Sequence, residues 1–178
     1  AGGSAGGLIS EAHKRAILSD NFAGMKVMSA NTLSSFTTGA GADRVGAITS
    51  VDVTYVTAKD TMTQAITVSG FNANLVVKAG DRLEVTGRNR LNLSTRTVIL
   101  DETATAIKFS GVVTTDVTLS GTGTGVIVIT GPAIFEAAGQ YNTTDSAIAA
   151  ADVITLLGAA STVLQPNLFW HKQAFTCA

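Results

Sequence analysis

The chain has 178 residues with a formal net charge of −1, and 14% of them are charged, against about 25% in an average soluble domain. The near-neutral balance excludes a broad basic surface for nucleic acid, and the single cysteine excludes an internal disulfide and a cysteine-based zinc site. No apolar run approaches the roughly 18 residues needed to span a bilayer, so we expect no membrane partner.

The amino-terminal segment predicts a short helix followed by a strand. Residues 1–7 contain only Gly, Ala and Ser, which is typical of a loop. Ser10 can cap a helix and Glu11 suits its first turn, so we expect a helix over about residues 10–18. The alternation in NFAGMKVMSA, residues 21–30, then predicts a strand, and loop-like sequence follows it.

From Ala47 to Ile134 short apolar runs alternate with turn residues. Val51, Val53 and Tyr55 share one face of a predicted strand, and later runs such as DRLEVTG and GVIVITG repeat the pattern. Gly, Asn and Asp separate these runs. Six or more strands at this spacing predict an antiparallel sandwich or a small barrel.

Beyond Pro132 the sequence becomes richer in alanine. Residues 152–157 fit either a helix or a buried strand, and periodicity leaves the two open. The closing stretch NLFWHKQAFTCA holds the only Trp and the only Cys of the chain. We expect part of it to wedge aromatic side chains into a core. These core-packing residues are Leu168, Phe169, Trp170 and Phe175.

The residues that could carry chemistry form no recognised motif. GTGTG, residues 121–125, lacks the lysine of a phosphate loop and precedes a strand, so it predicts a hairpin turn. His13 and His171 have no further ligand at metal-binding spacing, and Cys177 with His171 has no orienting third group nearby. The carboxylates Asp101, Glu102, Asp145 and Asp152 are scattered along the chain, with no sign of a shared cleft. We therefore predict no catalytic residue, no metal site, no cofactor and no enzymatic activity.

Four arginines gather in the stretch AGDRLEVTGRNRLNLSTR. This stretch fits either a basic loop that touches a partner or backbone phosphates, or an ordinary solvated turn. If it binds, a charged neighbouring protein suits it better than DNA, because the whole chain is close to neutral. The candidate contact residues are Arg82, Arg88, Asn89 and Arg90.

Four stretches, in this order, resemble segments of the major coat (capsid) proteins of tailed bacteriophages. ISEAHKRAILSDNFAGMKVMSANTLSSFTTG is similar to the helix, strand and loop that lead into that family's inserted domain. AGDRLEVTG with RNRLNLST, and then TTDVTLSGTGTGVIVITGPAIF, resemble the inserted domain itself. ADVITLLGAASTVLQPNLFWHKQAFTCA resembles the return into the capsid core. The resemblance is to the short-tailed Salmonella-phage type, whose coat protein carries an inserted β-barrel.

The resemblance implies a mainly β (α+β) fold in three parts. Residues 41–135 would form an antiparallel β-barrel insertion domain of six or more strands. Residues 1–40 and 136–178 would form a partial capsid-core subdomain with short helices. Because the family's amino-terminal half has no counterpart in this sequence, the resemblance also implies a carboxy-terminal-side fragment.

The function that the resemblance implies is structural. The chain would be a subunit of a phage or prophage capsid that self-assembles into an icosahedral shell around double-stranded DNA. Its partners would be other coat subunits, with scaffolding and portal proteins, and the packaged DNA would be only weakly contacted. It would reside in the virion after assembly in the bacterial host cytoplasm.

Two other functions remain open from the sequence. A secreted β-sandwich module of the adhesin type fits the Thr, Gly and Val content equally well, but it does not explain the alanine-rich end or the NLFWHKQAF element. A hydrolase or transferase on a β scaffold would need a pocket of convergent polar groups, which the sequence does not supply.

Overall fold

The computed structural model describes residues 17–22, 25–28, 34–58, 62–137 and 139–165. The chain divides into two compact units. One unit spans Phe36–Leu164, and the other combines Ala1–Ser35 with Gln165–Ala178. The described elements of the latter are β1 (Ile17–Phe22) and β2 (Met25–Met28), which pair as an antiparallel hairpin.

The first predicted elements are only partly confirmed. The strand expected within residues 21–30 is present as β2. The helix expected over residues 10–18 is wrong at its end, because Ile17 and Leu18 begin β1, and residues 10–16 lie outside the described part. Pairing with β2 supplies Ile17 with a cross-strand partner, Met28, whereas an isolated helix of this length is marginal in water.

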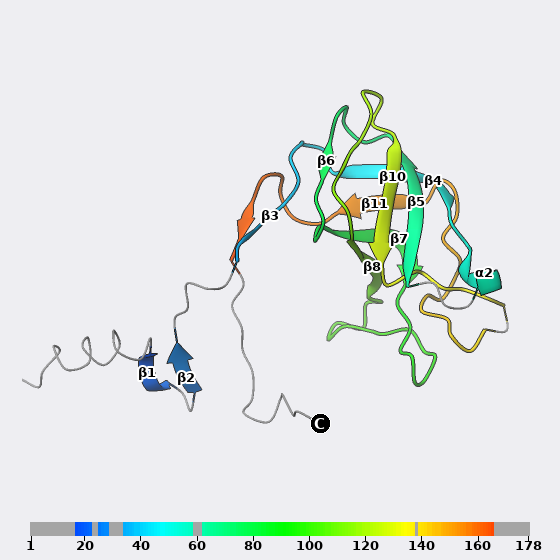
Figure 1. Ribbon diagram of the computed structural model, residues 1–178. Coiled ribbons are helices and arrows are strands. Elements are labelled where there is room, and N and C mark those ends of the chain that lie inside the picture. The colour runs from blue at the N-terminus through cyan, green and yellow to red at the C-terminus, as the bar shows by residue number, and fades with distance from the viewer. Residues whose placement is uncertain (1–16, 23–24, 29–33, 59–61, 138, 166–178) are drawn as a thin grey trace, which may run out of the picture. The chain divides into compact units, whose positions relative to one another are not determined.

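The larger unit is built around a closed antiparallel barrel (Figure 1). Its strand order is β10-β5-β4-β11-β7-β8, so the predicted antiparallel barrel of six or more strands is confirmed, with six. The strands are β4 (Val45–Val51), β5 (Thr63–Ser69), β7 (Arg82–Asn89), β8 (Lys108–Val113), β10 (Gly125–Thr130) and β11 (Val153–Leu156).

Alternation along these strands fills the barrel with aliphatic side chains. In β5 every second residue is buried, and the same period recurs in β10 and β11. A strand presents successive side chains to opposite faces, so this pattern places one face inside the barrel. The fully buried core includes Ile66, Val68, Leu83, Val85, Ile127, Ile129 and Ile154.

Strand β11 closes the barrel from late in the sequence. It lies between β4 and β7, pairing Ile154 with both Gly46 and Val85. Of residues 152–157, Val153–Leu156 therefore form a strand, and none is helical. The barrel extends past residue 135, where we expected the return segment to begin. Without β11, β4 and β7 would each present an unpaired edge.

The small elements lie outside the barrel wall. β3 (Phe36–Thr37) pairs with β12 (Val163–Leu164), and β6 (Val76–Val77) pairs with β9 (Val117–Thr118). The four-residue α2 (Tyr55–Ala58) is the only α-helix among the described residues, so the expected capsid-core helices are not seen there.

The strand predicted through Val53 and Tyr55 is wrong beyond Val51. The Asp52 side chain accepts hydrogen bonds from the backbone N–H and the hydroxyl of Thr54. An aspartate that binds the backbone two residues ahead turns the chain instead of extending it. This local turn leads directly into α2 (Figure 1).

The two ends of the barrel differ. The antiparallel order puts three long connections at one end, residues 52–62, 90–107 and 131–152, and we call this end the crown. The opposite end, which we call the base, holds the β6–β9 pair and the two chain segments that join the barrel to β3 and β12.

Candidate interaction surface

A cluster of metal ligands is the first candidate for a functional site. Among the described residues, no group of three or more His, Cys, Asp or Glu side chains could hold a metal ion. Within the same part of the chain, no helix is both long and apolar enough to span a membrane. Since the barrel interior is packed with aliphatic side chains, the outer surface is the candidate for function.

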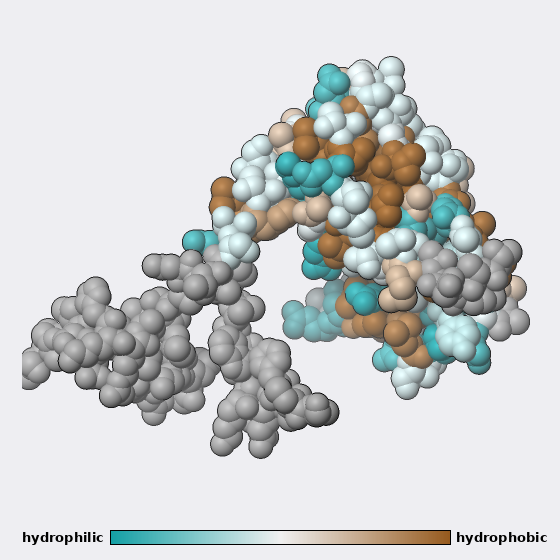
Figure 2. Space-filling model, viewed as in Figure 1, coloured by the Kyte–Doolittle hydropathy of each residue, from teal (hydrophilic) through white to brown (hydrophobic). Residues whose placement is uncertain are grey.

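Four adjacent strands form an uncharged wall. β10, β5, β4 and β11 are neighbours in the barrel, and none of them contains a charged residue. Outward positions such as Val126, Val45 and Val153 are 48%, 47% and 43% exposed. Figure 2 shows apolar residues gathered over β10. Depletion of charged residues is a feature of the central part of protein–protein interfaces, so this wall is a candidate contact surface.

The other two barrel strands, β7 and β8, carry charged residues. Lys108 on β8 lies 3.8 Å from Glu84 on β7. Arg82, at the start of β7, is exposed, and its guanidinium donates to the hydroxyl of Ser110 at 3.3 Å. The barrel therefore has a charged side and an uncharged side. The sequence shows which strands carry charges, but the strand order is needed to show that the uncharged strands are neighbours.

Two of the four predicted contact residues bind within the chain. Arg88 makes a two-bond contact to Asp152, at 2.7 Å to each carboxylate oxygen, and donates to the Ser146 hydroxyl at 3.0 Å. Asn89 donates through its backbone N–H and its side-chain amide to Asp145, at 2.9 and 2.7 Å. Both residues thus hold the segment that precedes β11.

These contacts shift the ionisation of the carboxylates. The hydrogen bond from Arg88 lowers the pKa of Asp152, and the same bond raises the pKa of Arg88. For Asp145, burial acts to raise the pKa, but hydrogen bonds from Asn89 and Ser146 together leave it below its usual value. Asp145 and Asp152 therefore belong to one cluster with Arg88, Asn89 and Ser146. The sequence did not show this cluster, because Asp152 is 64 residues from Arg88 and Asp145 is 56 residues from Asn89.

The remaining predicted contact residues are free to meet a partner. Arg82 and Arg90 are both exposed, and Arg90 stands where the chain leaves β7 for the crown. Its backbone N–H donates to the carbonyl of Ile107, so the first and last residues of the 90–107 connection are joined where it leaves the barrel. The structure places these two arginines at opposite ends of β7 rather than in one loop.

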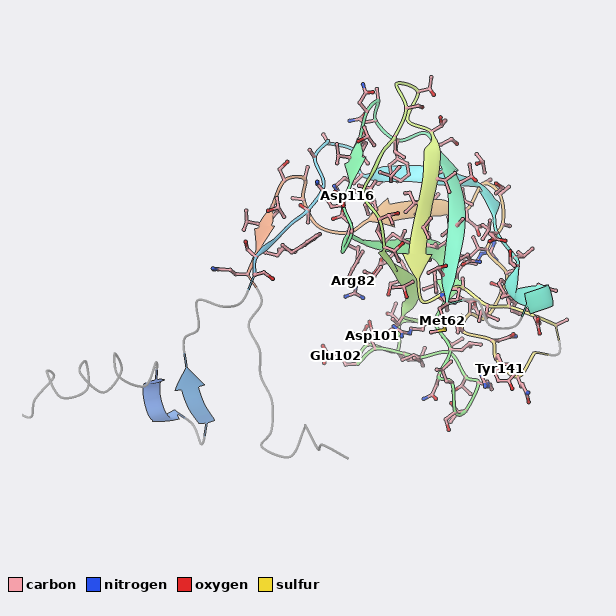
Figure 3. The ribbon with its side chains drawn as sticks, viewed as in Figure 1. Met62, Arg82, Asp101, Glu102, Asp116 and Tyr141 are labelled. Atoms are coloured by element: carbon pink, nitrogen blue, oxygen red, sulfur yellow. The ribbon has the colours of Figure 1, made fainter. Side chains whose placement is uncertain are left out.

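The crown presents both apolar and acidic side chains (Figure 3). Met62, Leu93 and Tyr141 are 76%, 61% and 63% exposed. Asp101 and Glu102 lie on the 90–107 connection, where the Thr103 hydroxyl donates to Asp101 and lowers its pKa. Periodicity in TMTQAITVS predicts Met62 on one face with Ile66 and Val68, but Met62 lies immediately before β5 and is exposed. Leu93 and Tyr141 lie in turns, where periodicity gives no signal.

The predicted core-packing element lies outside the described residues. Leu168, Phe169, Trp170 and Phe175 belong to it, and their packing role stays a prediction. His13, His171 and Cys177 also lie outside the described part of the chain.

A barrel whose interior is filled by side chains and whose outer wall is partly uncharged fits the class of structural or binding modules. The sequence comparison then identifies the family. A family model described as "P22 coat protein - gene protein 5" matches residues 2–178, and the chain belongs to this family of phage coat proteins. The family predicted from the four sequence stretches is thereby confirmed.

A curated relative agrees with this assignment. The chain is 27% identical over 168 residues to the major capsid protein of Acyrthosiphon pisum secondary endosymbiont phage 1. The match covers 93% of this chain and 40% of the relative, so the chain spans about two fifths of the length of the protein it matches. Neither comparison supports the adhesin alternative.

Proposed function

We propose that this chain is part of a structural capsid subunit that assembles with other copies of itself into an icosahedral shell around double-stranded DNA. The family match over residues 2–178 carries the proposal. Repeated modest contacts, multiplied by symmetry, are enough to stabilise such a shell. The uncharged wall supplies surface suited to such contacts, and the subunit catalyses no reaction.

The rest of the assembly follows from the same proposal. The barrel unit is inserted between two flanking stretches, which contribute to the capsid core. Scaffolding and portal proteins are partners during assembly in the host cytoplasm, and the subunit ends in the virion. The packaged DNA is only weakly contacted, in keeping with a net charge of −1.

Arg82 and Arg90 are the proposed contacts with a neighbouring subunit. Both are exposed, whereas Arg88 and Asn89 are half-buried and bind Asp152 and Asp145. Arg88 and Asn89 therefore contribute to the contact indirectly, by fixing the shape of the chain beside Arg90.

The direct test is co-expression of the gene that encodes this chain with a scaffolding protein of the same genome. We expect closed shells that contain the chain in electron micrographs of the sedimented material. Chain that stays soluble and never enters particles would overturn the proposal.

The paired variant Arg82→Ala and Arg90→Ala tests the contact. We expect the particle yield to fall about tenfold or more, because a loss of about 1.4 kcal/mol per contact already weakens each contact about tenfold, with an unchanged melting temperature. Lys108→Ala is the matched control, since it removes an exposed cation from β8, the strand beside β7, and it should leave the yield unchanged. Equal yields from all three proteins would remove Arg82 and Arg90 from the contact.

A further inference from the structure

The chain enters and leaves the barrel unit through one paired neck. We define the neck as residues 36–39 and 159–164. β3 and β12 pair Thr37 with Val163, and the backbone N–H of Thr38 donates to the carbonyl of Thr162 at 3.0 Å. The Thr38 hydroxyl donates to the carbonyl of Ala159 at 2.6 Å and accepts from the N–H of Thr162 at 2.8 Å.

Burial of apolar surface contributes little to the neck. Val163 and Leu164 are 63% and 49% exposed, and only Thr38 and Gly39 are buried among its incoming residues. Two pairs of strand residues cannot form a stable ribbon by themselves in water. Apart from the Phe36 ring, which lies against Gly80, the neck is attached to the barrel base by polar contacts.

A buried ion pair supplies these contacts. Arg44 and Asp81 are 7% and 1% exposed, and Nη2 of Arg44 lies 3.0 Å from Oδ2 of Asp81. Asp81 also accepts from the backbone N–H of Gly39 at 3.2 Å and of Lys78 at 2.9 Å. Nη1 of Arg44 donates to the carbonyl of Gly39 at 2.6 Å.

The same carbonyl links the two sides of the neck. Gly39 O also accepts from the N–H of Ser161 at 3.1 Å, so a single peptide group joins the incoming strand, the outgoing strand and the ion pair. A Cβ atom at Gly39 would lie 2.0 Å from the carbonyl oxygen of Val76. The neck backbone therefore lies directly against β6 at the barrel base.

We propose that the Arg44–Asp81 pair is a pin that locks the neck to the barrel base, so that neck and barrel move as one rigid body. Loss of the Asp81 charge releases the neck while the six barrel strands stay closed, because the aliphatic core inside the barrel does not include the pair. A buried ion pair is a poor source of stability compared with apolar packing. The hydrogen bonds that Asp81 accepts from the Gly39 N–H and that Arg44 donates to the Gly39 carbonyl are the contacts that fix the position of the neck. The inference concerns the barrel unit alone and does not rest on the proposed function.

Backbone ¹⁵N relaxation of the full chain carrying Asp81→Asn tests the pin. In the unsubstituted chain we expect order parameters of about 0.85 for Thr38, Gly39, Ser161 and Thr162, typical of rigid backbone. In the variant these four should fall below about 0.6, the flexible range. Ile66 and Ile129, which lie in barrel strands, should stay near the rigid value.

Asp116→Asn is the matched control. It breaks the exposed 2.8 Å pair between Asp116 and Lys78. Lys78 lies in the same turn as Asp81, and this variant should leave the neck rigid. Arg44→Met is a second test variant, since it removes the other half of the pin and leaves Asp81 with its backbone donors. Selective release of the neck in either test variant supports the proposal.

Two outcomes would overturn the pin. In one, the neck stays rigid in both Asp81→Asn and Arg44→Met. In the other, both variants lose the order of the barrel strands together with that of the neck, which would make the pair an integral part of the barrel.

Discussion

Arg88 illustrates how a residue with an expected external role can serve an internal one. Its guanidinium matches the planar geometry of the Asp152 carboxylate, a pairing that lysine could not reproduce. The sequence indicated that this arginine has neighbours of like charge, but it could not indicate Asp152, because 64 residues separate the two. Contacts between distant positions become visible only when the strand order is known.

The depressed pKa values of Asp145 and Asp152 predict a loss of stability in acid. A carboxylate whose pKa is lower in the folded chain stabilises the fold above its unfolded pKa, near 3.9, and loses this contribution as pH falls through the folded value. Arg88→Met should therefore cost about 2 kcal/mol at pH 7, the worth of a hydrogen bond between charged groups, and clearly less at pH 3.

Urea denaturation at the two pH values measures this difference. Arg82→Met serves as the control, because its guanidinium is exposed and bonds only a hydroxyl among the described residues. An Arg88→Met cost that is the same at pH 3 and pH 7 would show that the ion pair contributes nothing to the fold.

At the scale of elements, the strands that follow a strict alternation were predictable. The runs DRLEVTG and GVIVITG anticipated β7 and β10, because apolar residues at every second position match the period of a strand. α2 was missed because one side chain, that of Asp52, redirects the backbone. β11 could not be distinguished from a helix, since four residues are too few for the period to decide.

The turn between β9 and β10 was also predicted, and it offers a matched pair of glycines. Gly123 has a φ of +69°, and a Cβ there would lie 1.8 Å from the carbonyl oxygen of Phe71, whereas a Cβ at Gly121 would meet open space. We expect Gly123→Ala to cost at least about 2 kcal/mol, from backbone strain and the clash, and Gly121→Ala to be nearly neutral. Thermal melts would contradict this if the two variants unfolded together.

For the whole molecule, the topology makes the fold depend on its last barrel strand. β4 and β7 are distant in sequence, and in the described structure their facing edges are joined through β11. The barrel therefore cannot close until the chain beyond residue 152 has been placed. This dependence follows from long-range pairing, which the sequence pattern does not encode in any one segment.

Ile154→Lys tests this dependence with a charge inside the barrel. Ile154 is fully buried, and a lysine there must either lose its charge or leave the core, at a cost of several kcal/mol. Because β11 joins β4 to β7, we expect the strands of the whole barrel unit to lose hydrogen-exchange protection together, and the exposed edges of β4 and β7 to promote aggregation. Thr155→Lys, on the outer face of the same strand, should fold normally. If β5 and β10 kept their protection in Ile154→Lys, the barrel would be able to hold together without β11.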